Sequence, residues 1–128
     1  MKEVSTLIEF QQIINEQKVA VFCVKTLWSG DSMARIPAFE KLSLSNKNTP
    51  FYIIPNGDSR DEGDSFIYGW LKEQEGKNWA GTNTQIPVTT RSWIHGYSET
   101  FMIINGELKW FENRTEKVHD KHFIDCNQ

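Results

Sequence analysis

Apolar side chains recur along the chain at two different spacings, which predict helices and strands in turn. Between Thr6 and Gln17 they return every three or four residues, the spacing of one helix face. Thr6 and Glu9 fit a capping box, in which the two side chains satisfy backbone N–H groups at the start of a helix. Residues 19–25 are almost wholly apolar, β-branched or aromatic, which is typical of a central strand buried on both faces. The chain is therefore expected to open with a helix and a buried strand.

Helices and strands are predicted to go on alternating through the middle of the chain. Residues 33–42 have one apolar face and contain Pro37, which removes a backbone hydrogen bond and predicts a kink. Residues 50–55 have the pattern of a strand limited at both ends by proline. A third helix is predicted over residues 65–74, and residues 88–94 are a candidate for an extra strand.

The end of the chain carries the clearest local signal, that of a β-hairpin. Asn105 and Gly106 form a two-residue turn pair, flanked by strand-like residues 100–104 and 107–112. Residues 115–124 are predicted as a last helix with a thin apolar face. Strands that alternate with helices and end in a hairpin predict an α/β protein, with a mixed sheet and helices on both of its faces.

Composition and charge narrow the class of protein. The chain has 128 residues, of which 38% are apolar and 24% charged, so we expect one globular domain over residues 1–128. Its net charge is −3 and no basic cluster is present, which argues against nucleic acid or an anionic membrane as a partner. No apolar run approaches membrane length and no signal peptide is recognised, so a cytoplasmic location is expected.

Residues that bind metals or act as nucleophiles are sparse. The two cysteines, Cys23 and Cys126, are too few for a disulfide framework or a zinc site. Cys23 lies in the middle of a predicted strand, where a buried and unreactive thiol is expected. His119 and His122 lie three residues apart, a spacing that can share a metal, but Asp120 is the only further ligand type beside them. We therefore assign no catalytic residue, no metal and no cofactor.

A motif follows the predicted central strand: Trp28-Ser29-Gly30-Asp31-Ser32, with Pro37 five residues after Ser32. An apolar strand, a Trp-Cys-x-x-Cys motif and a proline five residues after the second cysteine are typical of the thioredoxin family. The first helix and the Asn-Gly hairpin also resemble that family, so the chain is similar to thioredoxins over about residues 4–58 and 94–124. The resemblance implies a thioredoxin-like fold, with a central mixed sheet of four or five strands flanked by helices and an insert at about 59–93.

The sequence departs from the thioredoxin pattern at the residues that carry the family's chemistry. Ser29 and Ser32 occupy the positions of the two redox cysteines. The family's cis-proline would fall at Ser98, and its buried carboxylate would fall at Cys23. Thiol–disulfide exchange requires an attacking thiolate and a second thiol that resolves the mixed disulfide, and a serine hydroxyl cannot form an S–S bond. The resemblance therefore implies a degenerate, redox-inactive site rather than a thiol–disulfide oxidoreductase.

The degenerate turn is the candidate functional site. Ser29, Asp31 and Ser32 are good helix N-caps, so they could serve only to satisfy backbone N–H groups. Alternatively, the free amides and the positive helix end bind an anionic or peptide ligand, although the charge of Asp31 disfavours an anion. The predicted ligand- or partner-binding groove combines the turn with residues that the fold would bring opposite it: Trp28, Ser29, Gly30, Asp31, Ser32, Trp93, Tyr97 and Ser98.

Two functions are compatible with this groove. The first is a non-catalytic module that binds a peptide or a partner protein. The alternative is an enzyme of the thioredoxin fold that binds glutathione, in which Ser29 hydrogen-bonds the thiolate of the ligand, as serine does in glutathione-dependent relatives of the fold. A homodimer formed through apolar residues of the insert is a further alternative.

Overall fold

A six-stranded mixed β-sheet forms the middle layer of the protein, in the order β1-β3-β2-β5-β6-β4. The computed structural model describes residues 1–57, 66–74, 77, 80–81 and 96–124. The strands are β1 (Lys2–Glu3), β2 (Val19–Thr26), β3 (Phe51–Asn56), β4 (Ala80–Gly81), β5 (Thr100–Ile104) and β6 (Glu107–Glu112). β1, β3 and β2 are parallel, β5 is antiparallel to both β2 and β6, and β4 is parallel to β6. The expected mixed sheet is confirmed, with the two-residue strands β1 and β4 added at its edges.

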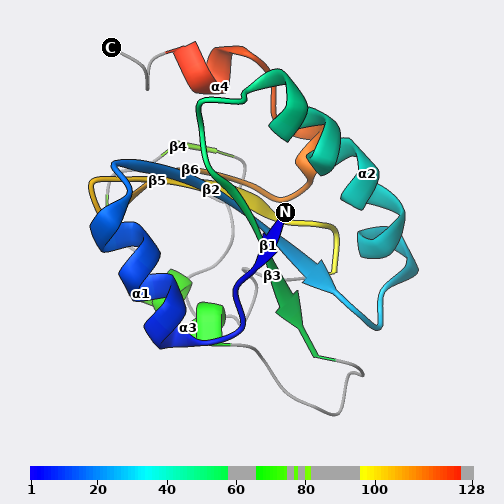
Figure 1. Cartoon of the computed structure of the whole chain (residues 1–128). Coiled ribbons are helices and arrows are strands. Elements are labelled where there is room, and N and C mark those ends of the chain that lie inside the picture. Colours follow the sequence, from blue (N-terminus) through cyan, green and yellow to red (C-terminus); the bar gives the residue numbers. More distant parts are fainter. Residues whose placement is uncertain (58–65, 75–76, 78–79, 82–95, 125–128) are drawn as a thin grey trace.

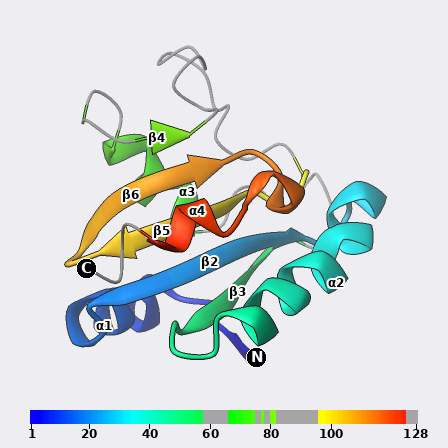
Figure 2. The same ribbon diagram turned by 90° about the horizontal axis from the view of Figure 1, so that it is seen from above.

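Helices cover both faces of the sheet (Figure 1, Figure 2). They are α1 (Leu7–Glu16), α2 (Gly30–Ser45), α3 (Phe66–Glu73), the 3₁₀ helix η3 (Thr115–Lys117) and α4 (Lys121–Ile124). Figure 1 shows α1 and α3 on one face of the sheet and α2 and α4 on the other. Within the described part of the chain, every helix is too short or too polar to cross a membrane.

The predicted central strand is confirmed as β2, which pairs with β3 on one side and β5 on the other. Its side chains alternate between two cores, as the two-residue period of a strand requires. Ala20, Phe22 and Val24 belong to the core under α1 and α3. Val21 and Cys23 belong to the core under α2 and α4. All five side chains are buried, so the continuous apolar run corresponds to a strand covered on both faces.

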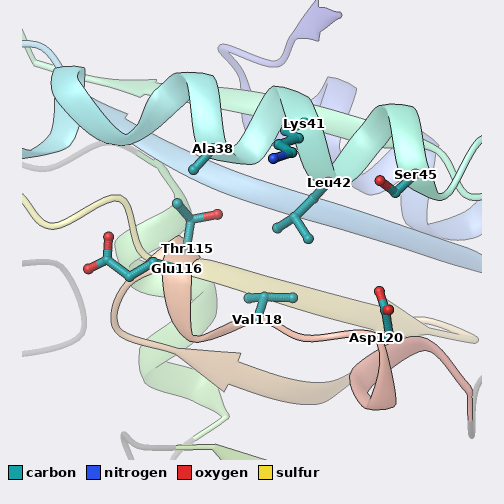
Figure 3. A pocket seen from close by; sticks show the side chains of 8 residues that line it. All are labelled: Ala38, Lys41, Leu42, Ser45, Thr115, Glu116, Val118 and Asp120. Carbon is teal, nitrogen blue, oxygen red and sulfur yellow. The ribbon is translucent and has the colours of Figure 1, made fainter.

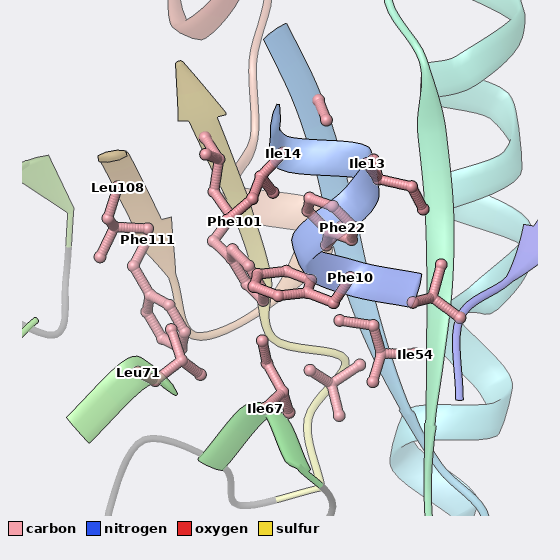
Figure 4. Close-up of a cluster of buried hydrophobic side chains, with 14 residues drawn as sticks. Phe10, Ile13, Ile14, Phe22, Ile54, Ile67, Leu71, Phe101, Leu108 and Phe111 are labelled. Carbon is pink, nitrogen blue, oxygen red and sulfur yellow. The ribbon is translucent and has the colours of Figure 1, made fainter. Parts of the chain in front are cut away.

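Aromatic rings pack against one another in the core under α1 and α3, surrounded by aliphatic side chains (Figure 4). Phe10 of α1 packs against Phe22 of β2 with ring centroids 5.0 Å apart, and against Trp70 of α3 at 5.1 Å. Phe101 of β5 lies between Phe22 and Phe111, at 5.5 and 5.9 Å. Burial of one such ring stabilises the fold by about 1.5–3 kcal/mol. The rings therefore account for a large share of the packing on this face.

Side-chain caps decide where the first two helices start. At α1, the Glu9 N–H donates to Thr6 Oγ1 at 3.1 Å, and the Glu9 carboxylate accepts from the Ser5 N–H at 3.3 Å. The Thr6 half of the predicted capping box is thus confirmed, whereas Glu9 bonds the N–H of Ser5, one residue before the N-cap, and the Thr6 hydroxyl. Helix α2 begins at Gly30 and is capped by the Ser29 side chain, one of the predicted N-caps, so it starts before the apolar face that begins at residue 33. The helix is therefore one turn longer at its start than the apolar face alone predicts.

The predicted last helix over residues 115–124 is wrong. The chain forms η3, then an extended residue at Val118, and then the single turn of α4. Val118 is 4% exposed and packs in the core under α2, which takes the backbone out of a helical path. Phe123 of α4 fills the same core, with its ring centroid 5.9 Å from that of Phe51. The thin apolar face therefore anchors two short pieces instead of one helix.

Strand β3 continues one residue beyond its prediction, through Pro55 to Asn56. Pro55 pairs with Lys25 of β2, whereas β1 pairs only with Tyr52 and Ile53. Pro55 thus lies beyond the reach of β1, where its missing N–H removes no ladder hydrogen bond. Helix α3 agrees with the predicted third helix, and the candidate strand over residues 88–94 lies outside the described residues.

Candidate functional site

Local hydrogen bonds shape the turn between β2 and α2. The Ser29 N–H donates to the Thr26 carbonyl at 3.1 Å, and the Ser29 hydroxyl oxygen accepts from the Ser32 N–H at 3.2 Å. The buried Ser32 hydroxyl accepts from the Thr26 N–H at 2.9 Å and donates to the Val24 carbonyl at 3.4 Å. Ser29 therefore caps the helix, and Ser32 ties the first helical turn to the end of the central strand.

A further hydrogen bond joins this turn to a segment that is distant in sequence. The Ser29 hydroxyl donates to the Gly96 carbonyl at 2.6 Å. Gly96 has a φ of 81°, and a Cβ atom placed on it would lie 3.0 Å from Ser29 Cβ and 3.2 Å from Trp28 Cη2. The left-handed backbone and the close approach both favour glycine here. Sequence reasoning missed Gly96, although a glycine directly before two predicted groove residues was a usable signal.

Residues 97 and 98 continue this segment into the sheet. Tyr97 is half-buried, and the guanidinium carbon of Arg114 lies 4.9 Å from its ring centroid, which is a cation–π contact. Ser98 is fully buried and has a φ of 64°. Its carbonyl accepts from the Thr100 hydroxyl at 3.0 Å and from the Cys23 thiol at 3.7 Å. Ser98 therefore supports the candidate surface from below. Arg114 is a second residue that sequence reasoning missed, and no local signal pointed to it.

Cys23 is buried, as expected for a thiol in the middle of the central strand. Burial raises the pKa of this thiol to about 12; the Thr100 hydrogen bond opposes that rise, and the Glu99 charge adds to it. The thiol therefore stays protonated at neutral pH and is a poor nucleophile. The Glu99 side chain is itself buried and accepts from the Tyr97 N–H at 3.3 Å. A buried carboxylate thus lies near the site, although Cys23 occupies the position at which the resemblance implies one.

The structure brings most of the predicted groove residues together, at two different depths. The exposed or half-buried members are Trp28, Ser29, Gly30, Asp31 and Tyr97. Trp28 is the large apolar member, with 37% of its surface exposed. Ser32 and Ser98 are both 0% exposed and lie beneath these residues. Trp93, the remaining predicted member, lies outside the described residues.

Charged side chains border the exposed part of the site. Arg35 Nε lies 2.9 Å from Glu116 Oε2, and Arg35 Nη1 lies 3.6 Å from Asp31 Oδ1. The Arg35 guanidinium also donates to the Asp31 carbonyl at 3.0 Å. Asp31 therefore has a cation beside it, which reduces the repulsion that its carboxylate alone would exert on an anionic ligand.

Of the two histidines in the C-terminal segment, His122 contacts β6 and His119 contacts His122. His122 Nε2 lies 2.8 Å from Glu112 Oε2, and the His122 ring packs edge-on against Trp110 with centroids 4.8 Å apart. The His119 N–H donates to His122 Nδ1 at 3.0 Å. These contacts dock α4 on the sheet. Across the ranges that the structure describes, no three His, Cys, Asp or Glu side chains converge as metal ligands would.

A groove of about 210 Å³ runs between α2 and the C-terminal segment (Figure 3). Its lining residues are Ala38, Lys41, Leu42, Ser45, Thr115, Glu116, Val118 and Asp120. Leu42 and Val118 point toward each other across it. Glu116 connects the groove with the border of the candidate site, because it also pairs with Arg35. The sequence pattern did not reveal this groove, since its two walls lie far apart in the chain.

Comparisons with known proteins bear on the fold. No family model and no curated protein matches the sequence. Among solved structures, the chain is similar to a thioredoxin of Plasmodium falciparum, with a TM-score of 0.61, 16% identity and 100% of both chains covered. It is similar to a Fasciola hepatica thioredoxin, with a TM-score of 0.59, 15% identity and 100% of both chains covered. It is also similar to a cysteine-to-serine mutant of an Entamoeba histolytica thioredoxin, with a TM-score of 0.61, 13% identity and 98% of both chains covered. The protein therefore has the thioredoxin fold.

Proposed function

We propose that this protein is a redox-inactive, thioredoxin-like binding module. It binds a peptide or a partner protein at the surface formed by Trp28, Ser29, Gly30, Asp31 and Tyr97, which we call the Trp28 surface. One observation carries the proposal: the turn holds Ser29 and Ser32 where the resemblance implies the redox cysteines, while Ser29 caps α2 and donates to the Gly96 carbonyl. Loss of the reacting groups without loss of the surrounding shape favours recognition over electron transfer.

The chemistry at the turn supports the absence of thiol–disulfide exchange. The Ser29 and Ser32 hydroxyls cannot form a mixed disulfide. Cys23 cannot replace them, because it is buried and its pKa is raised to about 12. A nucleophilic thiol must be accessible and at least partly ionised.

The composition of the Trp28 surface supports binding. Trp28 exposes 37% of its surface, and Met33 in the first turn of α2 exposes 42%. A rigid aromatic ring loses little conformational entropy when it binds, and such rings are frequent at the centres of interfaces. The backbone N–H groups at the start of α2 add hydrogen-bond donors beside the ring.

The glutathione-binding alternative is the weaker candidate. It requires the Ser29 hydroxyl to donate its hydrogen to the thiolate of the ligand. That hydrogen is already donated to the Gly96 carbonyl at 2.6 Å. A ligand thiolate would therefore have to replace an existing hydrogen bond. Stabilisation of the protein by glutathione in a thermal-shift titration would favour this alternative over the binding module.

An insulin-reduction assay tests the redox part of the proposal. The wild-type protein should give no turnover, and turnover would overturn it. The double variant S29C/S32C restores both thiols at the cap and in the first helical turn. This variant should form an intramolecular disulfide, detected as the loss of two hydrogens by mass spectrometry. The single variant S29C lacks the resolving thiol and is the matched control.

A screen of short random peptides tests the binding part. Wild-type protein should select a subset of peptides, and Trp28→Ala should weaken their binding by about tenfold or more, as expected for an aromatic hot spot. Leu44→Ala is the matched control, because Leu44 is an exposed apolar residue at the other end of the same helix. Equal binding by wild type and Trp28→Ala would contradict the proposed surface.

A further inference from the structure

Residues 96–98, which we call the facing segment, lie directly on the turn at Trp28 and Ser29. The Ser29 hydroxyl donates to the Gly96 carbonyl at 2.6 Å. A Cβ atom on Gly96 would lie 3.0 Å from Ser29 Cβ, 3.1 Å from Ser29 Oγ and 3.2 Å from Trp28 Cη2. The backbone of Gly96 is therefore in close contact with both residues. A chain that enters between the turn and the facing segment must first separate them.

The one hydrogen that the Ser29 hydroxyl can donate is used within the protein. Its oxygen accepts from the Ser32 N–H at 3.2 Å, and its one hydrogen goes to Gly96. A ligand carbonyl that needs this hydrogen must therefore displace the Gly96 carbonyl. The contact thus competes directly with any ligand for the same donor.

The two ends of the facing segment are held differently. Ser98 is fully buried, and its carbonyl accepts from the Thr100 hydroxyl and the Cys23 thiol. The next residue, Glu99, accepts from the Val24 N–H at 2.8 Å. At the other end, Ser29 supplies the hydrogen bond that Gly96 makes among the described residues. The end at Ser98 is thus anchored in the sheet, Tyr97 contacts Arg114 and Glu99, and the Gly96 carbonyl is held on the turn by Ser29.

We propose that the Ser29–Gly96 hydrogen bond is an intramolecular latch that holds the facing segment against the turn at Trp28 and Ser29, and that a peptide binds between the two by opening it. This inference rests on the proposed function. Ser29 is then a positioning residue, which acts through the facing segment. Because a closed state must open before it binds, the latch lowers the apparent affinity for a peptide by the fraction of molecules that are open.

Two substitutions separate the latch from the helix cap. Ser29→Asp keeps a good N-cap, but its carboxylate has no hydrogen for the Gly96 carbonyl and repels it. Ser29→Ala removes both the latch and the cap. Ser43→Ala is the matched control, because the Ser43 hydroxyl donates within α2, to the Glu40 carbonyl at 2.6 Å.

Amide hydrogen exchange of the free protein, followed by NMR, tests the latch without a ligand. Exchange of residues 96–98 should be about 3- to 10-fold faster in Ser29→Asp than in wild type, the range expected for one neutral hydrogen bond. It should be unchanged in Ser43→Ala. Exchange in β2 should stay the same, which excludes global unfolding as the cause. Unchanged exchange at residues 96–98 in Ser29→Asp would overturn the latch.

The peptides selected by the wild-type protein provide the second measurement. Ser29→Asp, which keeps the cap, and Ser29→Ala should both bind them about 3- to 10-fold more tightly, because less opening is required. Faster exchange at residues 96–98 combined with equal or weaker peptide binding would overturn the latch as a control of binding. A third outcome separates the two proposals. If no peptide binds the wild type or the variants, but amide exchange of residues 96–98 is still faster in Ser29→Asp, the Ser29–Gly96 contact is supported and the proposed function fails.

Discussion

The aromatic core under α1 and α3 and the Trp28 surface obtain their structure in different ways. In the core, Phe10, Phe22 and Phe101 are each 0% exposed, and Phe22 packs against both of the others. At the Trp28 surface, the shape depends on single polar contacts, such as that between Ser29 and Gly96. Apolar burial is non-directional and is shared among many contacts, whereas a hydrogen bond requires one particular donor and acceptor. The scaffold can therefore keep its fold while the chemistry of the turn changes.

Phe22→Ala should cause the largest loss of stability. The Phe22 ring packs against Phe10, Tyr52 and Phe101, so truncation removes buried area and leaves a cavity. We expect the free energy of unfolding to fall by about 3–5 kcal/mol. Urea denaturation followed by circular dichroism measures it. Ile8→Ala, on a side chain that is 70% exposed, is the control and should change stability by less than about 0.5 kcal/mol. Similar losses of stability in Phe22→Ala and Ile8→Ala would contradict the statement that buried rings carry the stability of the core.

Gly96→Ala should cause a smaller loss, confined to the candidate site. Alanine is strained at a φ of 81°, and its Cβ would lie 3.0 Å from Ser29 Cβ. We expect a loss of about 1–3 kcal/mol in the same denaturation experiment. Gly69→Ala in α3 is the matched control, because its added Cβ meets nothing within 4 Å. A helix interior favours alanine over glycine, so this control should gain up to about 1 kcal/mol. A neutral Gly96→Ala would show that the close approach is unimportant.

Alkaline pH should destabilise the protein through Cys23. Burial raises the pKa of its thiol from 9.0 to about 12, so above pH 9 the unfolded chain loses a proton that the folded protein keeps. The folded state then binds more protons, and stability falls as the pH rises from about 9 to about 12. At about pH 10.5 this thiol should account for a loss of about 2 kcal/mol.

Urea denaturation of wild type and Cys23→Ala at neutral and alkaline pH measures this contribution. Both proteins also carry Cys126→Ser, so that they differ only in whether the Cys23 thiol is present. The stability advantage of the protein with Cys23 should shrink as the pH rises. An advantage that is independent of pH would show that Cys23 ionises as readily in the folded protein as in the unfolded chain.

Arg35→Ala should have the smallest effect. Arg35 pairs with Glu116 and Asp31, but these carboxylates are 46% and 66% exposed, so water screens the pairs. We expect a loss of about 0.2–1 kcal/mol, which should diminish at about 1 M salt. The same urea denaturation at low and high salt checks both statements. A loss as large as that of Gly96→Ala would mean that charge, rather than the segment at Gly96, organises this surface.

The sequence by itself determined most of the fold. The helical spacing that starts at Thr6, the apolar run of β2 and the Asn105-Gly106 turn are local features, and each predicts one element without knowledge of its neighbours. The resemblance to thioredoxins implies that Ser29 and Ser32 replace the thiols of that family. That substitution bears on chemistry directly, because it does not depend on how the chain packs.

Only the tertiary structure decided how the candidate site is built. The contact between Ser29 and Gly96 and the burial of Ser98 join segments that are far apart in the chain. The split of the last helix at Val118 likewise depends on a core that α2 supplies. A repeating pattern records which face of an element is apolar, but it does not record which distant group meets that face. Individual hydrogen bonds between distant residues therefore become visible only when the sheet brings their partners together.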